Sequence, residues 1–558
     1  MKTNEYDAIV IGSGISGGWA AKELTERGLK TLLLERGRNL EHIRDYTNAT
    51  KDPWEMPHRG GATLADRQSH PVLGSTGYIT EANLDYWVDE KEAPYTQVKP
   101  YNWMRGYHLG GRSLMWGRQS YRLSDFDFEA NLKEGVGSDW PLRYKEIAPW
   151  YDHVERFAGI SGSIEHMPQL PDGQYQPAME MNFVEKDVAE RIAKLYGGQR
   201  RMIIGRTANI TLPLPGRTNC QYRNKCILGC PFGGYFSTQS STLPAAMVTG
   251  NLTVRPWSIV TQILYDKDTK KATGVEVLDA ENNKTYTYKA KIVFLNASTF
   301  NSTWVLMNSA TDIWQGGLGS SSGQLGHNVM DHHVGGGASG VMEGHEDKYY
   351  FGRRANGIYI PRYRNLFGDK RDYLRGFGYQ GGGGRETWSR EIAEINIGAE
   401  FKDALTEPGL WNMSIVSFGE VLPYYDNKLS INKAVKDKWG LNTLDVDIEL
   451  KDNERKMRID MEADAIEMLE KSGLKSVKGF IRRNNIGAIH EMGAARMGAD
   501  PKTSVLNKFN QVWDAQNVFV TDGSFMVSSS CVNPSLSYMA FTARAADHAV
   551  SELKKGNI

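Results

Sequence analysis

Residues 6–37 read YDAIVIGSGISGGWAAKELTERGLKTLLLERG, and this stretch decides the fold of the chain. DAIVI is a short apolar run that predicts a buried strand, and the triplet Gly12-x-Gly14-x-x-Gly17 follows it directly. A helical pattern comes next, and KTLLLE predicts a second strand that ends in Glu35. Strand, glycine turn, helix and strand in this order are typical of a Rossmann-like unit that binds a dinucleotide.

Each part of this unit has a physical task. The glycines permit a tight turn and a close approach of the backbone to a pyrophosphate, and the helix N-terminus offers free N–H groups to the phosphates. Glu35 stands 23 residues after Gly12, where a carboxylate can accept hydrogen bonds from a ribose. A βαβ unit without a phosphate ligand is the structural alternative. The triplet does not separate NAD from FAD, because both bind through the same adenosine diphosphate half.

Composition excludes several classes of protein. The chain has 558 residues, with 66 Lys+Arg against 66 Asp+Glu, so no net charge favours nucleic acid or an anionic membrane. No apolar run approaches the roughly 18 residues of a membrane helix. The N-terminus has no sections of a secretion signal, which predicts a cytoplasmic protein by its own sequence. Three of the four cysteines are clustered, which does not suit a disulfide framework.

The rest of the chain predicts a composite α/β enzyme. Residues 40–100 show little helical periodicity and are interpreted as an extended excursion over a cofactor. Residues 331–480 alternate apolar and polar positions, as in an antiparallel sheet, and contain one strong helix, DNERKMRIDMEADAIEMLEKSG. We predict a Rossmann-like dinucleotide-binding domain assembled from distant segments, with an inserted α+β substrate domain. The predicted boundaries are 1–160, 205–330 and 485–558 for the first domain, and 331–484 for the second.

Two C-terminal stretches indicate the class: IHEMGAARMGADP with His490, and VFVTDGSFMVSSSCVNPSLSYMAFTARAADHA with Asn533. Together with the glycine triplet, Glu35 and the LGGRS loop, they closely resemble the glucose–methanol–choline (GMC) family of flavin oxidoreductases. The likeness to bacterial sugar and glucoside 3-dehydrogenase large subunits and to pyranose oxidases is strongest. It is weakest over 331–480, where such enzymes hold their substrate.

The resemblance implies that FAD occupies the first domain and that His490 and Asn533 lie side by side over the flavin. A histidine can take the hydroxyl proton at neutral pH while a hydride leaves the adjacent carbon, and an asparagine amide can hold the same oxygen. The structural alternatives are that His490 is a histidine on a turn without a catalytic role, and that Asn533 is an ordinary helix cap. The family pattern also assigns cofactor contacts to Gly110, Gly111, Ser113, Val260, Asp522, Gly523, Pro534 and Ser535.

The loop GGRSLMW, which ends at Trp116, differs from the corresponding loop of pyranose oxidases. Pyranose oxidases place a histidine there and bond it to the flavin, whereas this chain has Met115 in front of Trp116. A thioether cannot form that link, so we predict non-covalent FAD. His108, seven residues earlier, is interpreted as structural.

Cys220, Cys226 and Cys230 lie within eleven residues. Thiolates hold iron–sulfur clusters, and three of them in one loop suit a three-iron, four-sulfide cluster. Bacterial FAD sugar dehydrogenases of this family carry such a cluster, although this chain has five intervening residues where the family pattern has four. Packed thiols, a zinc site and a disulfide stay open as alternatives. Cys531 is interpreted as packing near the active site.

The resemblance therefore predicts an FAD-dependent sugar dehydrogenase. It would oxidise a secondary hydroxyl, first of all at C3, of a pyranose or glycoside, and send electrons through the cluster to a cytochrome c. A small partner subunit is also implied, and a signal on it would export both chains to the periplasm. The rival interpretations are an oxidase that makes hydrogen peroxide, an inactive FAD-binding assembly subunit, and an NAD-dependent reductase.

Overall fold

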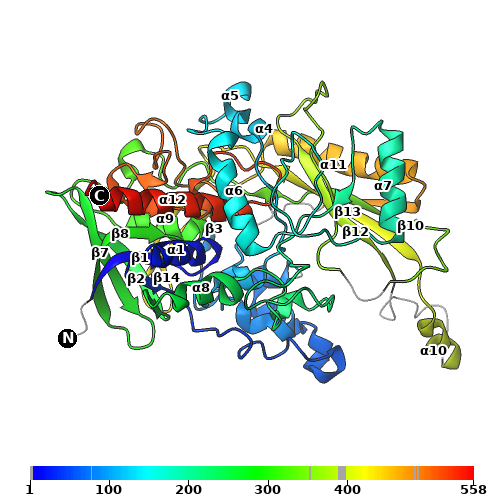
Figure 1. Cartoon of the computed structure of the whole chain (residues 1–558), viewed down its shortest axis with the longest axis horizontal. Coiled ribbons are helices and arrows are strands. Elements are labelled where there is room, and N and C mark those ends of the chain that lie inside the picture. The colour runs from blue at the N-terminus through cyan, green and yellow to red at the C-terminus, as the bar shows by residue number, and fades with distance from the viewer. Residues whose placement is uncertain (1–3, 77, 351–353, 387–397, 482–485, 487–488) are drawn as a thin grey trace.

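The computed structural model describes residues 4–76, 78–350, 354–386, 398–481, 486 and 489–558, and two sheets organise it (Figure 1). The first sheet has eight strands, in the order β17-β18-β8-β1-β2-β5 with the hairpin β6–β7 joined to β8. Its strands are β1 (Glu5–Ile11), β2 (Thr31–Leu34), β5 (Leu252–Arg255), β6 (Ser258–Asp266), β7 (Lys271–Asp279), β8 (Thr285–Leu295), β17 (Gln511–Val512) and β18 (Ala515–Val520). Pairings of β1 with β2 and β8, of β2 with β5 and of β8 with β18 are parallel.

Helices cover both faces of this sheet, which is why β1 reads as a continuous apolar run. Ala8 and Val10 pack with α1 (Ile15–Glu26) and α12 (Ser535–Lys555), which lie side by side (Figure 1). Ile9 and Ile11 point to the opposite face, in one cluster with α9 (Thr299–Asn308). The predicted strands and helix of residues 6–37 are confirmed, and so is a sheet assembled from three distant parts of the chain.

The second sheet has seven strands, in the order β16-β10-β13-β12-β11-β4, with β9 paired to β13. Every pairing in it is antiparallel, which confirms the predicted sheet class. Its strands are β4 (Ile203–Ile204), β9 (His332–His333), β10 (Gly336–Met342), β11 (Ile358–Ile360), β12 (Phe377–Arg385), β13 (Trp411–Glu420) and β16 (Lys475–Ile481). The predicted strong helix is α11 (Asp452–Lys471), and it packs on β10 and β13.

One strand and one helix from outside residues 331–484 contact the second sheet. The edge strand β4 and the helix α7 (Phe183–Leu195) both contact it, α7 through β12 and β13. A strand of two residues has no periodicity to read, so the sequence gives no signal for β4.

A hairpin within residues 331–484 lies against the first domain and not in the second sheet. Strands β14 (Lys428–Lys436) and β15 (Asn442–Asp447) pair with each other, and β15 also pairs with β3 (Thr96–Gln97), which makes a sheet of three strands. At the hairpin tip Asp437 forms an ion pair with Arg36 at 2.8 Å, and the guanidinium of Arg36 lies 5.3 Å from the ring of Trp439. A part of residues 331–484 thus packs beside the dinucleotide fold.

Residues 40–100 differ from the predicted extended excursion, because they contain several short helical turns. Among them are α2 (Leu64–Ser69) and α3 (Pro71–Gly74). A capping box between Thr63 and Asp66 starts α2. Helices of four to six residues complete less than two turns, too few for a helical pattern to repeat. The remaining α-helices are α4 (Asp125–Phe128), α5 (Ala130–Glu134), α6 (Tyr144–Ala158), α8 (Leu243–Val248) and α10 (Ala399–Thr406).

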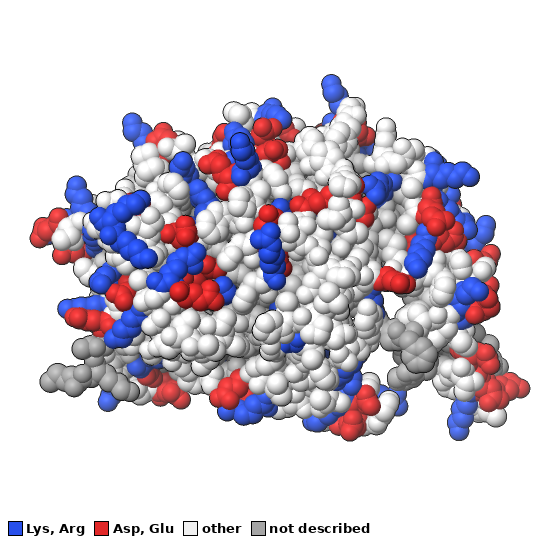
Figure 2. All heavy atoms as spheres, in the orientation of Figure 1, with Lys and Arg blue, Asp and Glu red and all other residues white. Residues whose placement is uncertain are grey.

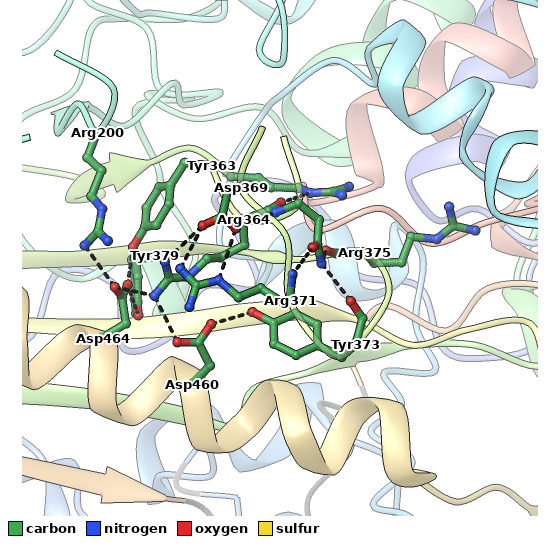
Figure 3. A network of polar contacts seen from close by, with 12 residues as sticks. Arg200, Tyr363, Arg364, Asp369, Arg371, Tyr373, Arg375, Tyr379, Asp460 and Asp464 are labelled. Carbon is green, nitrogen blue, oxygen red and sulfur yellow. Dashed lines mark hydrogen bonds and ion pairs between the residues drawn. The ribbon is translucent and has the colours of Figure 1, made fainter. Parts of the chain in front are cut away.

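A buried network of polar side chains ties α11 to the second sheet (Figure 3). The carboxylate of Asp464 accepts hydrogen bonds from Tyr363 and Tyr379, and it forms ion pairs with Arg364 at 2.7 Å and Arg200 at 2.9 Å. The buried carboxylate of Asp464 therefore has partners of complementary charge and polarity. The outer surface mixes both signs of charge on the face drawn in Figure 2. None of the helices in the described part of the chain has the length and apolar character of a membrane span.

Candidate active site

The glycine turn and the N-terminus of α1 form an open cradle at the edge of the first sheet. Gly12 has φ +89°, and a Cβ on Gly17 would collide with the carbonyl oxygen of Gly12. A Cβ on Gly14 would meet nothing within 4 Å, so this residue faces free space. Within the described residues no side chain caps α1, which leaves the N–H groups of its first turn available to an anion.

Glu35 lies beside this cradle and is buried. The backbone N–H of Ser13 donates to its carboxylate at 3.2 Å, the hydroxyl of Ser13 donates to the same oxygen, and the N–H of Gly37 donates to the other at 2.8 Å. Burial raises the pKa of Glu35. Oε1 of Glu35, which accepts only from Gly37, keeps capacity to accept a further hydrogen bond, as a ribose hydroxyl requires.

A cavity of about 460 Å³, here called the cofactor cavity, extends from this cradle to His490 and Asn533. The size is within the range of about 300–1,000 Å³ that ligand sites occupy. The predicted cofactor residues that line it are Gly12, Gly14, Glu35, Gly111, Ser113, Val260, Asp522, Gly523 and Ser535. Gly17, Gly110 and Pro534 are not in its wall: Gly17 packs on the glycine turn, Gly110 packs on Gln239, and Pro534 is the N-cap of α12.

His490 and Asn533 come together at the far end of this cavity, although 43 residues separate them in sequence. The amide nitrogen of Asn533 lies 3.4 Å from Nε2 of His490. The side-chain amide of Gln380 donates to Oδ1 of Asn533 at 2.6 Å, so the amide nitrogen of Asn533 must face the histidine. The contact with the amide nitrogen of Asn533 therefore makes Nε2 of His490 a hydrogen-bond acceptor.

The other ring nitrogen of His490 leads to the same assignment. Nδ1 of His490 lies 2.9 Å from Nδ1 of His332, and Nε2 of His332 lies 3.4 Å from the carbonyl oxygen of Ser529. A carbonyl only accepts, so Nε2 of His332 donates, and Nδ1 of His332 accepts the proton on Nδ1 of His490. The lone pair of His490 is therefore on Nε2, which points to Asn533.

Burial, assisted by the groups behind His490, keeps this imidazole neutral. Burial lowers the pKa of His490 well below its usual value, and the neighbouring His332 and Arg112 add to this. Arg112 forms a two-pronged ion pair with Glu491, at 3.2 and 2.5 Å. Asp331 accepts from the backbone N–H groups of His332 and His490, and burial with the nearby Glu491 raises the pKa of Asp331 to about 7. A neutral imidazole with a free lone pair can serve as a general base.

Sequence reasoning missed several residues of this site. Gln380 and Phe418 line the cofactor cavity from the second sheet, and Arg112 and Glu491 line it beside predicted positions. His332 is on β9, which pairs with the end of β13. A run of two histidines in MDHHVGG was a signal for His332, but nothing local connects it to residue 490.

Met115 borders the cofactor cavity, whereas His108 is buried outside its wall. Met115 lines the cofactor cavity in front of Trp116. His108 is buried with Nδ1 2.9 Å from the carbonyl oxygen of Leu109, and burial lowers its pKa to about 4. Cys531 is buried near Tyr359, and burial raises the pKa of its thiol to about 12.

The three clustered thiols line a separate, larger groove and are half-buried. The N–H of Gly234 donates to Sγ of Cys230 at 3.3 Å, and a Cβ on Gly234 would lie 3.2 Å from Cα of Cys220. Over the described residues, no group of three or more His, Cys, Asp or Glu side chains is close enough to hold a single metal ion. Each thiolate of a cluster binds its own iron, so cluster ligands stand farther apart than the ligands of one ion.

Cations surround the thiols, which suits an anionic cluster. Nη2 of Arg217 and Nε of Arg118 are buried and have no hydrogen-bond partner among the described residues. Burial lowers the pKa of Arg217 to about 10, and the nearby Cys230 opposes that shift. Ile227, next to Cys226, lines both this groove and the cofactor cavity.

Comparison with known proteins gives the class of this cavity. The N-terminal GMC oxidoreductase profile matches residues 6–334, and the C-terminal profile matches residues 423–542. The 2-methyl-1,2-propanediol dehydrogenase of Mycolicibacterium austroafricanum is 26% identical, over 98% of this chain and 95% of its own. The fructose dehydrogenase large subunit of Gluconobacter japonicus is 24% identical, over 100% and 99%.

Among solved structures, pyridoxine 4-oxidase from Mesorbium loti aligns with a TM-score of 0.58 at 16% identity, over 97% of this chain and 98% of that one. This likeness shows the fold. Two buried atoms in the cavity wall, Oδ1 of Asn296 and Nε of Arg36, have no hydrogen-bond partner in the described part of the chain and are free to bond a polar ligand. The uncapped helix and Glu35 fit the diphosphate and ribose of FAD. The chain belongs to the GMC oxidoreductase family, enzymes that use FAD to oxidise CH–OH groups.

Proposed function

We propose that the chain is an FAD-dependent dehydrogenase that oxidises a secondary hydroxyl of a pyranose or glycoside to a ketone, with C3 the first position to test. The observation that carries this proposal is the His490–Asn533 pair at the end of the cofactor cavity, with the lone pair on Nε2. Two relatives, a diol dehydrogenase and a sugar dehydrogenase subunit, support an alcohol of this kind.

Different groups would take the proton and the hydride of the substrate. FAD, when bound, supplies the acceptor for the hydride that leaves the carbon bearing the hydroxyl. Nε2 of His490 takes the hydroxyl proton, and Nδ2 of Asn533 donates a hydrogen bond to the same oxygen. Gln380 keeps the amide of Asn533 in its orientation, and His332 keeps the proton of His490 on Nδ1.

The cofactor would be held without a covalent bond. The first turn of α1, Glu35 and the lining residues of the cofactor cavity would bind its adenosine diphosphate half. Met115 stands where a linking histidine would be required, and a thioether forms no such bond. Denatured, filtered protein should therefore release all its flavin as free FAD.

Cys220, Cys226 and Cys230 would hold a three-iron, four-sulfide cluster, which would supply a one-electron relay toward a cytochrome-type acceptor. The cationic side chains around the thiols support this, and so does Ile227, which borders the cofactor cavity. A relative that is a large subunit supports a small partner subunit. The compartment stays a prediction: cytoplasmic by its own sequence, and periplasmic with a signal-bearing partner.

The test of the function is anaerobic bleaching of the flavin absorbance by a panel of sugars and glycosides, with the ketone position read from the product by NMR. His490→Ala should keep FAD and slow flavin reduction by about 10²–10⁴-fold, the usual cost of losing a general base. Bleaching by no sugar, or a wild-type rate in His490→Ala, would contradict the proposal.

The test of the cluster is a low-temperature electron paramagnetic resonance spectrum of the air-oxidised holoenzyme, with iron measured on the same sample. A signal from most molecules that disappears in Cys226→Ser, while sugar still bleaches the flavin, is the expected outcome. Iron-free protein that produces hydrogen peroxide from O₂ would make the enzyme an oxidase with packed thiols.

A further inference from the structure

The hairpin of β14 and β15 contacts the first domain at several places. The backbone N–H of Lys438 donates to the carbonyl oxygen of Glu92 at 2.9 Å, and the indole N–H of Trp439 donates to the carbonyl oxygen of Ala280 at 3.1 Å. Strand β15 also pairs in parallel with β3. The hairpin is therefore fixed against two stretches of the first domain that are far apart in sequence.

The tip of this hairpin holds the side chain of Arg36. Oδ2 of Asp437 accepts a hydrogen bond from Nη2 of Arg36 at 2.8 Å, and the side chain of Asp437 is only 5% exposed. The guanidinium lies 4.7 Å from the ring centre of Tyr107 and 5.3 Å from that of Trp439, within the range of cation–π contacts. Oδ1 of Asp437 accepts from the backbone N–H groups of Trp439 and Leu441, each at 3.0 Å. One carboxylate thus closes the turn and fixes the guanidinium.

Arg36 belongs to the wall of the cofactor cavity at the end where Glu35 lies. It follows Glu35 in the chain, and Tyr107 lines the cavity together with both residues. Asp437 occupies Nη2 of Arg36, whereas Nε has no hydrogen-bond partner among the residues that the structure describes. A guanidinium carries five N–H donors, so Arg36 keeps donors for an acceptor atom of a ligand.

The same hairpin holds a second wall residue of the cofactor cavity, Trp304 of α9. The carbonyl oxygen of Asn442, the first residue of β15, accepts a hydrogen bond from Nε1 of Trp304 at 2.9 Å. Trp304 is buried and lines the cavity. Its indole has the apolar face on which a flat base can stack. The hairpin thus fixes two wall residues, one a cationic donor and one an aromatic ring.

We infer that Asp437 is a positioning residue for the cofactor, and that it fixes Arg36 where the guanidinium binds the adenosine half of FAD. Adenine is flat and carries acceptor nitrogens, and the ribose carries acceptor oxygens, so a cationic donor with an indole on the same hairpin suits this ligand. The inference rests on the proposed non-covalent binding of FAD and not on the sugar. A segment within residues 331–484 would then determine how tightly the first domain holds its cofactor.

The experiment is a calorimetric titration of the full-length chain, after removal of its flavin, with FAD and separately with ADP, which is the adenosine half alone. Arg36→Met should raise the Kd of both ligands by about 2–12-fold, as expected for the loss of one hydrogen bond. Asp437→Asn should raise both by up to the same factor, because its amide places N–H donors against the guanidinium while Oδ1 still closes the turn. The double variant should bind no more weakly than Arg36→Met, because Asp437 acts through Arg36.

Lys433→Ala is the control, because Lys433 is exposed on β14 of the same hairpin, and it should leave both Kd values within twofold. Kd values within twofold of wild type in Arg36→Met or Asp437→Asn would overturn the inference. A double variant whose loss equals the product of the two single losses would also overturn it, because Asp437 would then act without Arg36. Equal weakening by Lys433→Ala would reduce the effect to general loosening of the hairpin and overturn it too. No sugar enters these titrations, so failure of the proposed oxidation would leave their result readable.

Discussion

The contact between His332 and His490 makes a quantitative prediction. Replacing His332 with Leu removes the acceptor for the proton on Nδ1 of His490, at 2.9 Å in the structure. The imidazole must then either leave a buried donor unsatisfied or move the proton to Nε2, where it blocks the base. A buried donor without a partner costs about 1–3 kcal/mol. We therefore expect His332→Leu to slow flavin reduction by about 5–160-fold.

The measurement is the rate constant of anaerobic flavin reduction by stopped flow, at saturating sugar and with FAD content verified from the flavin spectrum. His332→Asn provides the decisive comparison, because Oδ1 of asparagine can accept at the place of Nδ1 and should recover most of the rate. His333→Asn is the control, since His333 is equally buried on β9 but faces Arg458 at 3.4 Å. A His332→Leu rate within twofold of wild type, or no recovery with Asn, would refute the tautomer assignment.

Two other predictions follow from the charges. Below its pKa His490 is protonated and cannot take a proton, so its lowered pKa should put the acidic limb of the reduction rate below pH 6.5. Arg112→Met removes a positive charge that lowers this pKa and should move the limb to higher pH, whereas a limb that stays in place would show that Arg112 does not act on His490. Asp464→Ala should lower the free energy of unfolding by about 3–5 kcal/mol in urea melts, because Arg364 and Arg200 lose a fully buried carboxylate. Asp372→Ala, at an ion pair whose carboxylate is 76% exposed, should cost about 0–1 kcal/mol, and equal losses would argue against a special role for the buried network.

The sequence alone determined the parts of this protein whose cause is local. The turn at Gly12, the uncapped helix after it and the buried strand before it follow from the order of residue types, because a tight turn, a phosphate cradle and an apolar β-run each need specific neighbours in the chain. The helix 452–471 could be predicted from the sequence because its pattern is also local. His490 and Asn533 were predicted as site residues from the resemblance to a family, and the structure brings Nε2 of His490 within 3.4 Å of Nδ2 of Asn533.

Only the tertiary structure decided what surrounds that pair. Gln380 reaches Asn533 from β12, and His332 reaches His490 from a strand of two residues that exists only because it pairs with the end of β13. The tautomer of His490 depends on both contacts, and each joins residues more than 150 positions apart. Such contacts leave no periodic or local pattern, because the packing of two sheets, and not the neighbouring residues, brings the atoms together.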